Sequence, residues 1–299
     1  MPTARVKSAQ SGPGRKSATR RAGRLTAKRR AARTRKPAAV SMSREGGAVF
    51  PRILCPDDPK VSVIIPAMNE EKTIAQVIGQ AARVHDSAEV IVVVNGSTDR
   101  TPDIAKEMGA RVLWYPWPLG HDVGRAIGAA AARGDILLFT DGDLVIPAED
   151  LKPLVKAVEN GTDVALNRYL GPTDKMQAHN VIVAKHALNT ALLRPDLKGA
   201  SLTTIPHALS RRALEAIGIE ALAVPPKAYA IALFRGLKVE AVHYIHVGHN
   251  KSRRKKLDGK DPLEWLILGD HLEALHWLTE QTDSRLKRTD LTRKRELVQ

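Results

Sequence analysis

The sequence predicts an α/β fold in which a mostly parallel central sheet is flanked by helices. Continuously apolar, β-branched runs at 61–65, 89–94 and 135–140 are typical of strands buried on both faces of a parallel sheet. Helical patterns lie between these runs, so strands and helices alternate as in a doubly wound fold. Polar, turn-forming residues follow each run directly.

The first half of the chain alternates strictly between the two kinds of element. Its predicted strands are 61–65, 89–94, 111–114 and 135–140, and its predicted helices are 74–81, 101–108 and 122–133. The second half is less regular. Its predicted helices are 148–160, 178–193, 210–217, 226–235 and 262–280, and its predicted strands are 163–166 and 237–247.

The basic residues gather at one end of the chain. Residues 1–44 contain 14 of the 47 Lys and Arg residues and no Asp or Glu, so the rest, with 33 basic and 32 acidic residues, is nearly neutral. The net charge of +15 therefore comes from the tail, and it does not indicate a fold built around a nucleic acid. We expect residues 1–48 to be a disordered basic tail, either solvated or a weak tether to an anionic membrane or nucleic acid.

The remaining composition fits a cytoplasmic protein, with contact to a membrane surface left open. Cys55 is the only cysteine, so no internal disulfide can form, and no apolar run is long enough for a membrane span. We expect one large domain at 49–282 and a charged tail at 283–299.

Three polar clusters follow predicted strands, at 66–70, 95–99 and 141–143. Ligands of doubly wound sheets bind beyond the carboxyl ends of the strands, where these clusters would meet. Asp141 and Asp143 are two residues apart and can face the same ligand, which suits a divalent cation such as Mg²⁺ or Mn²⁺. Read alone, Asp-Gly-Asp is also an ordinary turn.

The segments VSVIIPAMNEE, VVVNGSTDRT and GDILLFTDGDL resemble, in order and spacing, glycosyltransferases of the GT-A fold close to family 2. The resemblance is strong over 60–145 and weaker over 146–250. NGSTD and LLRPDLKGASLTTIPHALSRRAL are most similar to enzymes of the glucosyl-3-phosphoglycerate synthase and mannosylglycerate synthase type. The resemblance implies a nucleotide-sugar half at 60–145, an acceptor half at 146–250, and a loop with a C-terminal helix at 251–282.

The resemblance also implies which residues bind the donor. In the three clusters and the segment before 122–133 they are Pro66, Ala67, Asn69, Glu70, Asn95, Gly96, Ser97, Gly120, Gly124, Arg125, Asp141 and Gly142. Relatives often carry Asp at the position of Asn95, so a UDP-linked and a GDP-linked hexose both stay open. Arg125 lies in the stretch where relatives often carry Gly-Lys-Gly. It is expected near the diphosphate or base, or else as a solvated helix residue.

Asp143 matches the metal-bridging carboxylate of the DXD motif, and Asp141 the one nearer the ribose or metal. Together with Arg125 they are the predicted catalytic residues. A histidine is expected as a further metal ligand, with His249 preferred to His246. Arg253 and Arg254 belong to a basic segment that either closes over the diphosphate or is a solvated charge run.

The acceptor pocket is the least defined part of the prediction. Its candidate residues are Arg168, Tyr169, Gly199, Thr203 and His207, and together with Arg194 and Lys198 they would suit a small polar, anionic acceptor. Inverting relatives usually place an acidic base where this chain has 224–229, a stretch without carboxylates. A retaining reaction is therefore slightly favoured, and Glu220 keeps an inverting one open.

Three other functions are weighed against this one. An inverting family 2 transferase would act on a lipid-phosphate or polysaccharide acceptor. A nucleotidyltransferase would need a Gly-rich loop with a Lys or Arg after the first strand, which PAMNEEKT lacks. A non-catalytic protein would be tethered to nucleic acid through its tail. The oligomeric state is left open, with a homodimer as one outcome.

Overall fold

The computed structural model describes residues 52–171, 177–247 and 261–298. Their strands form one seven-stranded sheet in the order β3-β2-β1-β4-β6-β5-β7. The strands are β1 (Val61–Ala67), β2 (Ala88–Asn95), β3 (Arg111–Tyr115), β4 (Ile136–Phe139), β5 (Val164–Asn167), β6 (His207–Ser210) and β7 (Val239–His243). β6 runs antiparallel to β4 and β5, and the other pairs are parallel, so the predicted mostly parallel sheet is confirmed.

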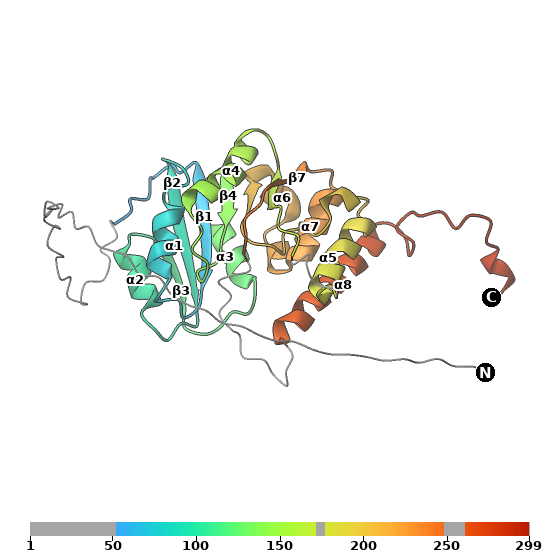
Figure 1. The fold of residues 1–299 in the computed structure, drawn as a ribbon, viewed down its shortest axis with the longest axis horizontal. Coiled ribbons are helices and arrows are strands. Elements are labelled where there is room, and N and C mark those ends of the chain that lie inside the picture. The colour runs from blue at the N-terminus through green and yellow to red at the C-terminus, as the bar shows by residue number, and fades with distance from the viewer. Residues whose placement is uncertain (1–51, 172–176, 248–260, 299) are drawn as a thin grey trace, which may run out of the picture. The chain divides into compact units, whose positions relative to one another are not determined.

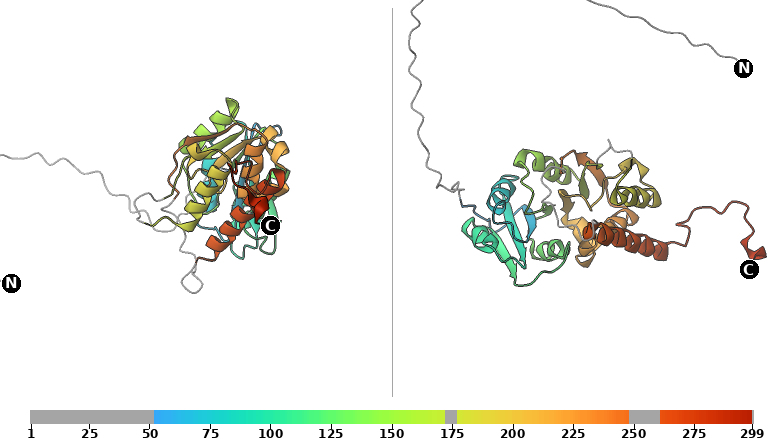
Figure 2. Two further views of the ribbon diagram at one scale, coloured as in Figure 1. Left: turned by 90° about the vertical axis from the view of Figure 1, so that its right-hand side faces the viewer. Right: turned by 60° about the horizontal axis from the view of Figure 1, so that its bottom comes forward.

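Helices cover both faces of this sheet (Figure 1, Figure 2). They are α1 (Ile74–Ala81), α2 (Thr101–Glu107), α3 (Val123–Ala131), α4 (Ala148–Glu159), α5 (Asn180–Ala191), α6 (Arg211–Ile217), α7 (Pro225–Phe234) and α8 (Pro262–Gln281). One apolar core packs α1, α2 and α4 against the sheet, and a second core packs α3 and α5–α8 on the other face. Successive residues of β1 enter alternate cores, as the twofold period of a strand requires.

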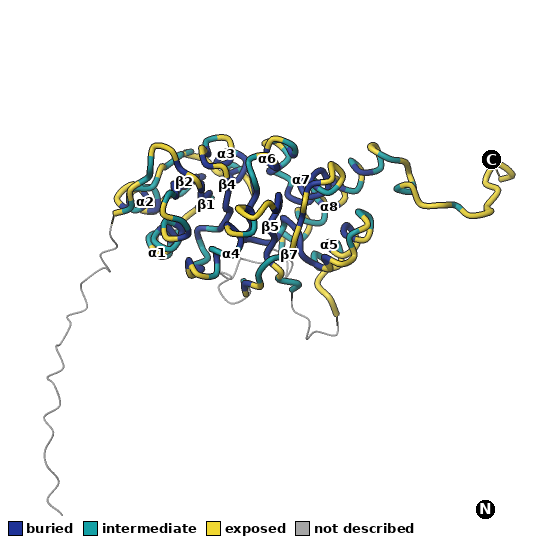
Figure 3. Tube along the Cα trace, turned by 90° about the horizontal axis from the view of Figure 1, so that it is seen from above, coloured by how far each residue is buried: buried dark blue, intermediate teal, exposed yellow. Residues whose placement is uncertain are grey.

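The central strands form a buried middle layer, while the edge strands β3 and β7 are partly exposed. Exposed residues lie mainly on the outer sides of the helices and in loops (Figure 3). This explains the continuous apolar runs of the sequence, because a strand covered on both faces has no solvent side. None of the described helices has the length and apolar character that a membrane span requires.

Two predictions about strands need correction. β6 was not predicted, because its sequence His-Ala-Leu-Ser has no β-branched residue and only pairing with Phe139 and Leu166 makes it a strand. The strand predicted at 237–247 is shorter and ends at His243. His246 therefore lies beyond the strand.

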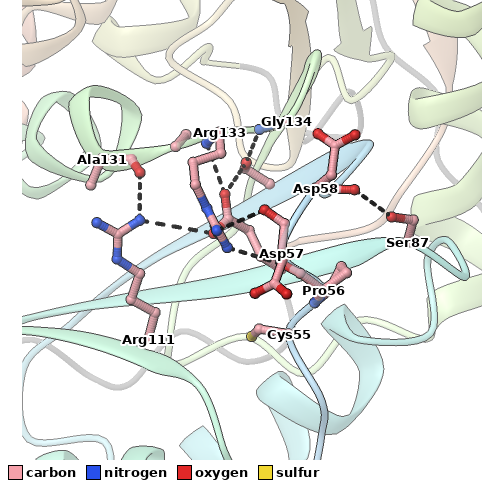
Figure 4. Close-up of polar contacts among 12 residues, drawn as sticks. Cys55, Pro56, Asp57, Asp58, Ser87, Arg111, Ala131, Arg133 and Gly134 are labelled. Atoms are coloured by element: carbon pink, nitrogen blue, oxygen red, sulfur yellow. Dashed lines mark hydrogen bonds and ion pairs between the residues drawn. The ribbon is translucent and has the colours of Figure 1, made fainter.

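A buried glutamate, Glu89, lies at the amino-terminal edge of the sheet, near the start of β2. The Ser62 hydroxyl and the Arg133 backbone N–H donate to one carboxylate oxygen at 2.7 and 2.8 Å, and the Arg133 guanidinium donates to the other at 3.0 and 3.2 Å. Arg133 also donates to the carbonyls of Pro56 and Asp57 (Figure 4). Burial alone would raise the pKa of Glu89, but these donors outweigh it and hold the pKa below its usual value.

Candidate donor site at the carboxyl edge of the sheet

The loops after β1, β2 and β4 meet at the opposite edge, as predicted. The Asn69 N–H donates to the Ser97 hydroxyl at 3.0 Å, and the Thr98 N–H donates to the Asn69 side chain at 2.8 Å. The Gly142 N–H donates to the Pro66 carbonyl at 3.2 Å, which ties the third loop to the first. The candidate donor residues from 66 to 97 and from 141 to 142 therefore belong to one crevice.

Close packing explains the glycine between the two aspartates. A Cβ on Gly142 would lie 3.0 Å from the Cβ of Ala67 and 3.3 Å from the Pro66 carbonyl oxygen. The Thr73 hydroxyl donates to the Gly142 carbonyl at 2.8 Å and so fixes the turn from the side of α1. A larger residue would push the acidic turn away from the first loop.

Glu70 is the most perturbed carboxylate of this edge. Burial first, and then the charge of Asp143, raises its pKa to about 7, with smaller contributions from Asp99 and Asp141. The Thr73 hydroxyl, which donates at 3.2 Å, only partly offsets this effect. An excess of negative charge thus lies beside the acidic motif, and perturbed carboxylates of this kind mark functional sites.

A divalent cation fits this donor set in charge and in ligand type. Asp143 and Asp141 offer carboxylate oxygens, and a cation would relieve the repulsion that Glu70 experiences. Within the described residues, no three His, Cys, Asp or Glu side chains form a ready-made metal cluster. The remaining ligands would have to come from phosphates, water or the undescribed segment that contains His249.

Arg125 is buried and turned toward the acidic motif. Its Nη2 donates to Asp141 Oδ1 at 2.8 Å, and its Nη1 pairs with the carboxylate of Asp122. The solvated-residue interpretation is therefore wrong, since only 7% of Arg125 is exposed. Direct contact between Arg125 and the donor stays a prediction. Gly124 lies against Pro66 in the same wall, and Gly120 adopts a φ of +95° in the preceding loop.

The predicted histidines are only partly described. His246 is exposed, and its ring lies edge-on to Tyr169 with 5.8 Å between the centroids. His243 pairs with Asp150 at 3.6 Å. His249, Arg253 and Arg254 lie outside the described residues, so their assignment to metal and diphosphate stays a prediction.

The candidate acceptor residues do not lie together: some line a groove, and others are buried or half-buried elsewhere. Arg168, Arg194 and Lys198 line a groove of about 690 Å³ over the edge strand β7, whose lining includes none of the residues assigned to the donor crevice. Gly199 lies between Leu170 and His186, and Thr203 is half-buried. The use of His207 as an acceptor-binding cation is wrong. The residue is buried in β6 against Phe139, and burial lowers its pKa to about 4.

Sequence reasoning did not assign three of the residues that join these loops to the site. Thr73 joins the first loop to the acidic turn, Thr101 accepts from the Glu70 N–H at 2.7 Å, and Asp122 pairs with Arg125. The two threonines stand at helix starts, where hydroxyl residues ordinarily cap, and that position is the signal that could have identified them.

The fold and the site together define a class of protein, the GT-A enzymes, in which loops at the carboxyl edge of a parallel sheet receive a nucleotide-linked sugar. The sequence profile described as "Glycosyl transferase family 2" matches residues 62–217, which is more than half of the chain. The chain therefore belongs to glycosyltransferase family 2.

Individual relatives agree with this assignment. The chain is 35% identical over 104 residues to dolichyl-phosphate hexose transferase of Haloferax volcanii, which covers 35% of this chain and 45% of the relative. It is 40% identical over 96 residues to glucosyl-3-phosphoglycerate synthase of Mycolicibacterium paratuberculosis, which covers 29% of each chain. The matched segment thus spans less than half the length of these relatives.

Among solved structures, the chain is similar to glucosyl-3-phosphoglycerate synthase of Mycobacterium tuberculosis. The complex with UDP gives a TM-score of 0.56 at 25% identity, over 73% of this chain and 80% of the other. A complex with Mn²⁺, UDP and phosphoglyceric acid gives a TM-score of 0.55 at 25% identity, over 78% and 80%. The likeness therefore extends well beyond residues 60–145, over which the sequence resemblance is strong.

Proposed function

We propose that this chain transfers a hexose from a nucleotide diphosphate sugar, UDP- or GDP-linked, to a small polar acceptor, with Mg²⁺ or Mn²⁺ as cofactor. The observation that carries the proposal is the crevice in which three loops bring Asp141, Asp143 and the strongly perturbed Glu70 together. The similar structures that bind UDP with Mn²⁺ support a UDP-linked donor.

In this proposal Pro66, Asn95 and Ser97 receive the nucleoside, while Asp143 and Asp141 face the diphosphate. The cation, when bound, would neutralise the charge that develops on the departing diphosphate. The protein holds these loops in position. The Thr73 hydroxyl donates to the Gly142 carbonyl, and the two hydrogen bonds that Asn69 forms with Ser97 and Thr98 join the two nucleoside loops. Fixed loops of this kind reduce the ordering needed when donor and acceptor meet.

The acceptor half supports a retaining reaction more than an inverting one. Where an inverting base is expected, Lys227 pairs with Glu273 at 2.9 Å and the Tyr229 hydroxyl donates to Asn189 at 2.7 Å. Val224–Tyr229 therefore offers no carboxylate to take the acceptor proton. Glu220 is exposed on the short helix Glu220–Ala223 and is the candidate base of the inverting alternative.

The acceptor itself is proposed to be anionic, such as a phosphorylated or carboxylated small molecule. The groove that contains Arg168 and Lys198 supports this class, as does the phosphoglyceric acid bound by the similar structure. A lipid phosphate is the second candidate, because one relative is a dolichyl-phosphate hexose transferase. The cytoplasmic location and membrane contact of this chain stay predictions.

A ligand screen tests the donor. Ligands that bind the folded chain raise its melting temperature by mass action. We expect UDP or GDP, with Mn²⁺, to raise the melting temperature of the full chain, and ATP with Mn²⁺ to leave it unchanged. If no nucleoside diphosphate shifts the melting temperature at millimolar concentration, the proposal is wrong.

Product analysis tests the rest. The nucleotide sugar that binds best is incubated with phosphoglyceric acid or with a polyprenyl phosphate in detergent, and the anomeric configuration of the product is read by NMR. Retention of the donor configuration is expected. An inverted product would favour the inverting alternative, with Glu220 as its candidate base. Transfer only to the polyprenyl phosphate would overturn the small-molecule acceptor and leave the donor proposal standing.

A further inference from the structure

Arg125 is enclosed by two carboxylates at the inner wall of the donor crevice. It lies in the first turn of α3, and only 9% of its side chain is exposed. One guanidinium nitrogen pairs with Asp122 and the other donates to Asp141 at 2.8 Å. The planar guanidinium holds its donors in a fixed fork, so binding both carboxylates fixes their relative positions.

Asp122 is placed for this contact at a conformational cost. Its backbone has φ 65° and ψ −18°, in the left-handed region that few residues other than glycine adopt, and its side chain is 4% exposed. Aspartate tolerates this conformation better than most residues. A buried carboxylate also needs a partner, and Arg125 supplies it. The backbone conformation of Asp122 therefore places its carboxylate against Arg125, and the charge of Arg125 stabilises that buried carboxylate.

The surroundings hold the guanidinium in place. Phe139 and His207 lie beneath Arg125 with Leu202, Leu222 and Pro225, around a space of only about 10 Å³. His207 is neutral near pH 7, since burial lowers its pKa to about 4, and so adds no second cation beside Arg125. If Arg125 swung into the crevice to follow a ligand, it would break its contacts with both Asp141 and Asp122. Among the described residues, Asp122 would then keep only His121, whose Nε2 lies 3.4 Å from its carboxylate.

We propose that Arg125, held by Asp122, is a positioning residue for the acidic motif: it fixes one oxygen of Asp141, which leaves the other oxygen and Asp143 to face donor and cation. This inference rests on the proposed function and goes beyond it, because it assigns Arg125 to the motif and not to the diphosphate. It also divides the motif into a restrained carboxylate, Asp141, and a carboxylate that would hold the cation, Asp143.

A double-mutant cycle on Mn²⁺-dependent nucleotide binding tests the proposal. The variants are Arg125→Met, Asp141→Asn and the double variant, and the dissociation constant of UDP or GDP with Mn²⁺ is measured by calorimetry. Loss of a residue that orients a metal-site ligand typically weakens affinity about 10–100-fold. We expect about a tenfold loss for Arg125→Met and a loss at least as large for Asp141→Asn. The double variant should bind no more weakly than Asp141→Asn, because Arg125 acts only through Asp141.

Arg133→Met is the matched control. It also removes an arginine from a buried carboxylate, but at the opposite edge of the sheet. We expect it to lower the melting temperature while leaving the nucleotide affinity of the folded protein unchanged. Arg125→Lys keeps the charge and loses the fork, so a positioning role predicts an affinity between those of the native protein and Arg125→Met. This variant also serves where Arg125→Met does not fold.

The outcomes separate the two proposals. If the native chain binds no nucleoside diphosphate with Mn²⁺, the proposed function fails and this inference with it. If it binds, and the two losses multiply in the double variant, Arg125 contacts the donor independently and the inference is wrong. If Arg125→Met and Arg125→Lys change the melting temperature alone, the role of Arg125 is structural and the inference is likewise overturned.

Discussion

Glu89 and Glu70 are two glutamates at opposite edges of the same sheet, and their environments differ in a way that separates structure from function. Glu89 is completely buried, yet its pKa is lowered because Ser62 and Arg133 donate to both of its oxygens. Glu70 is only half-buried, yet burial and the charge of Asp143 raise its pKa to about 7. Burial alone thus does not decide the direction in which the pKa of a carboxylate shifts; the hydrogen-bond donors and neighbouring charges decide it together with burial.

The arginines at the two edges differ in the same sense. Arg133 donates hydrogen bonds to one carboxylate and to two backbone carbonyls, and so joins residues 56–57 to this edge of the sheet. Arg125 forms ion pairs with two carboxylates, one of which belongs to the acidic motif. The charged groups described at the amino-terminal edge are therefore paired with each other. Among the described residues, the carboxyl edge keeps an excess of negative charge, to which a ligand can bind.

The largest expected effect follows from removing the charge of Asp143. Asp143→Asn should lower kcat/KM for sugar transfer by at least about a hundredfold, since cation-assisted charge stabilisation supplies several kcal/mol. The matched control is Asp135→Asn, which removes an exposed carboxylate from the other end of β4. Steady-state kinetics check both variants. Equal activity of Asp143→Asn and the native chain would place the acidic site elsewhere.

The second effect is on stability, at the amino-terminal edge. Arg133→Met should lower the free energy of unfolding by about 2 kcal/mol, below the usual 3–5 kcal/mol for a broken buried pair because Ser62 still donates to Glu89. Urea unfolding followed by circular dichroism measures the change. A loss under about 0.5 kcal/mol would show that the Glu89 network stabilises little.

The third effect is a pH dependence at the carboxyl edge. Because the folded chain raises the pKa of Glu70 from 4.5 to about 7, it holds this proton more tightly than the unfolded chain. The contribution of Glu70 to stability is thus complete below pH 4.5 and is lost as the pH rises to about 7. Glu70→Gln should flatten this decline, giving a higher melting temperature than the native chain at pH 8 without added metal. An unchanged pH profile would contradict the assigned environment.

The smallest effect concerns an exposed ion pair. Lys60 and Asp135 lie 2.7 Å apart at the amino-terminal edge, but 49% and 67% of their side chains are exposed. Surface pairs contribute about 0–1 kcal/mol and are screened by salt. Lys60→Met should therefore leave the free energy of unfolding unchanged within the error of the same urea titration. A measurable loss would mean that this edge depends on more than the Glu89 network.

Much of the fold could be predicted from the sequence because its signals are local. The apolar runs of β1, β2 and β4 and the polar residues after them sufficed to predict a parallel sheet and the convergence of 66–70, 95–99 and 141–143 at one edge. β6 and the early end of β7 could not be predicted, because pairing partners far along the chain determine them.

The sequence by itself therefore determined the fold class, the family resemblance and the acidic motif, since hydrophobic period and motif spacing are properties of neighbouring residues. Only the tertiary structure decided which charges are paired. It buried His207, turned Arg125 toward Asp141 and placed the half-buried Glu70 beside Asp143, whose charge helps to raise its pKa. Burial and pairing depend on residues distant in sequence, and they decide which polar side chains remain for chemistry.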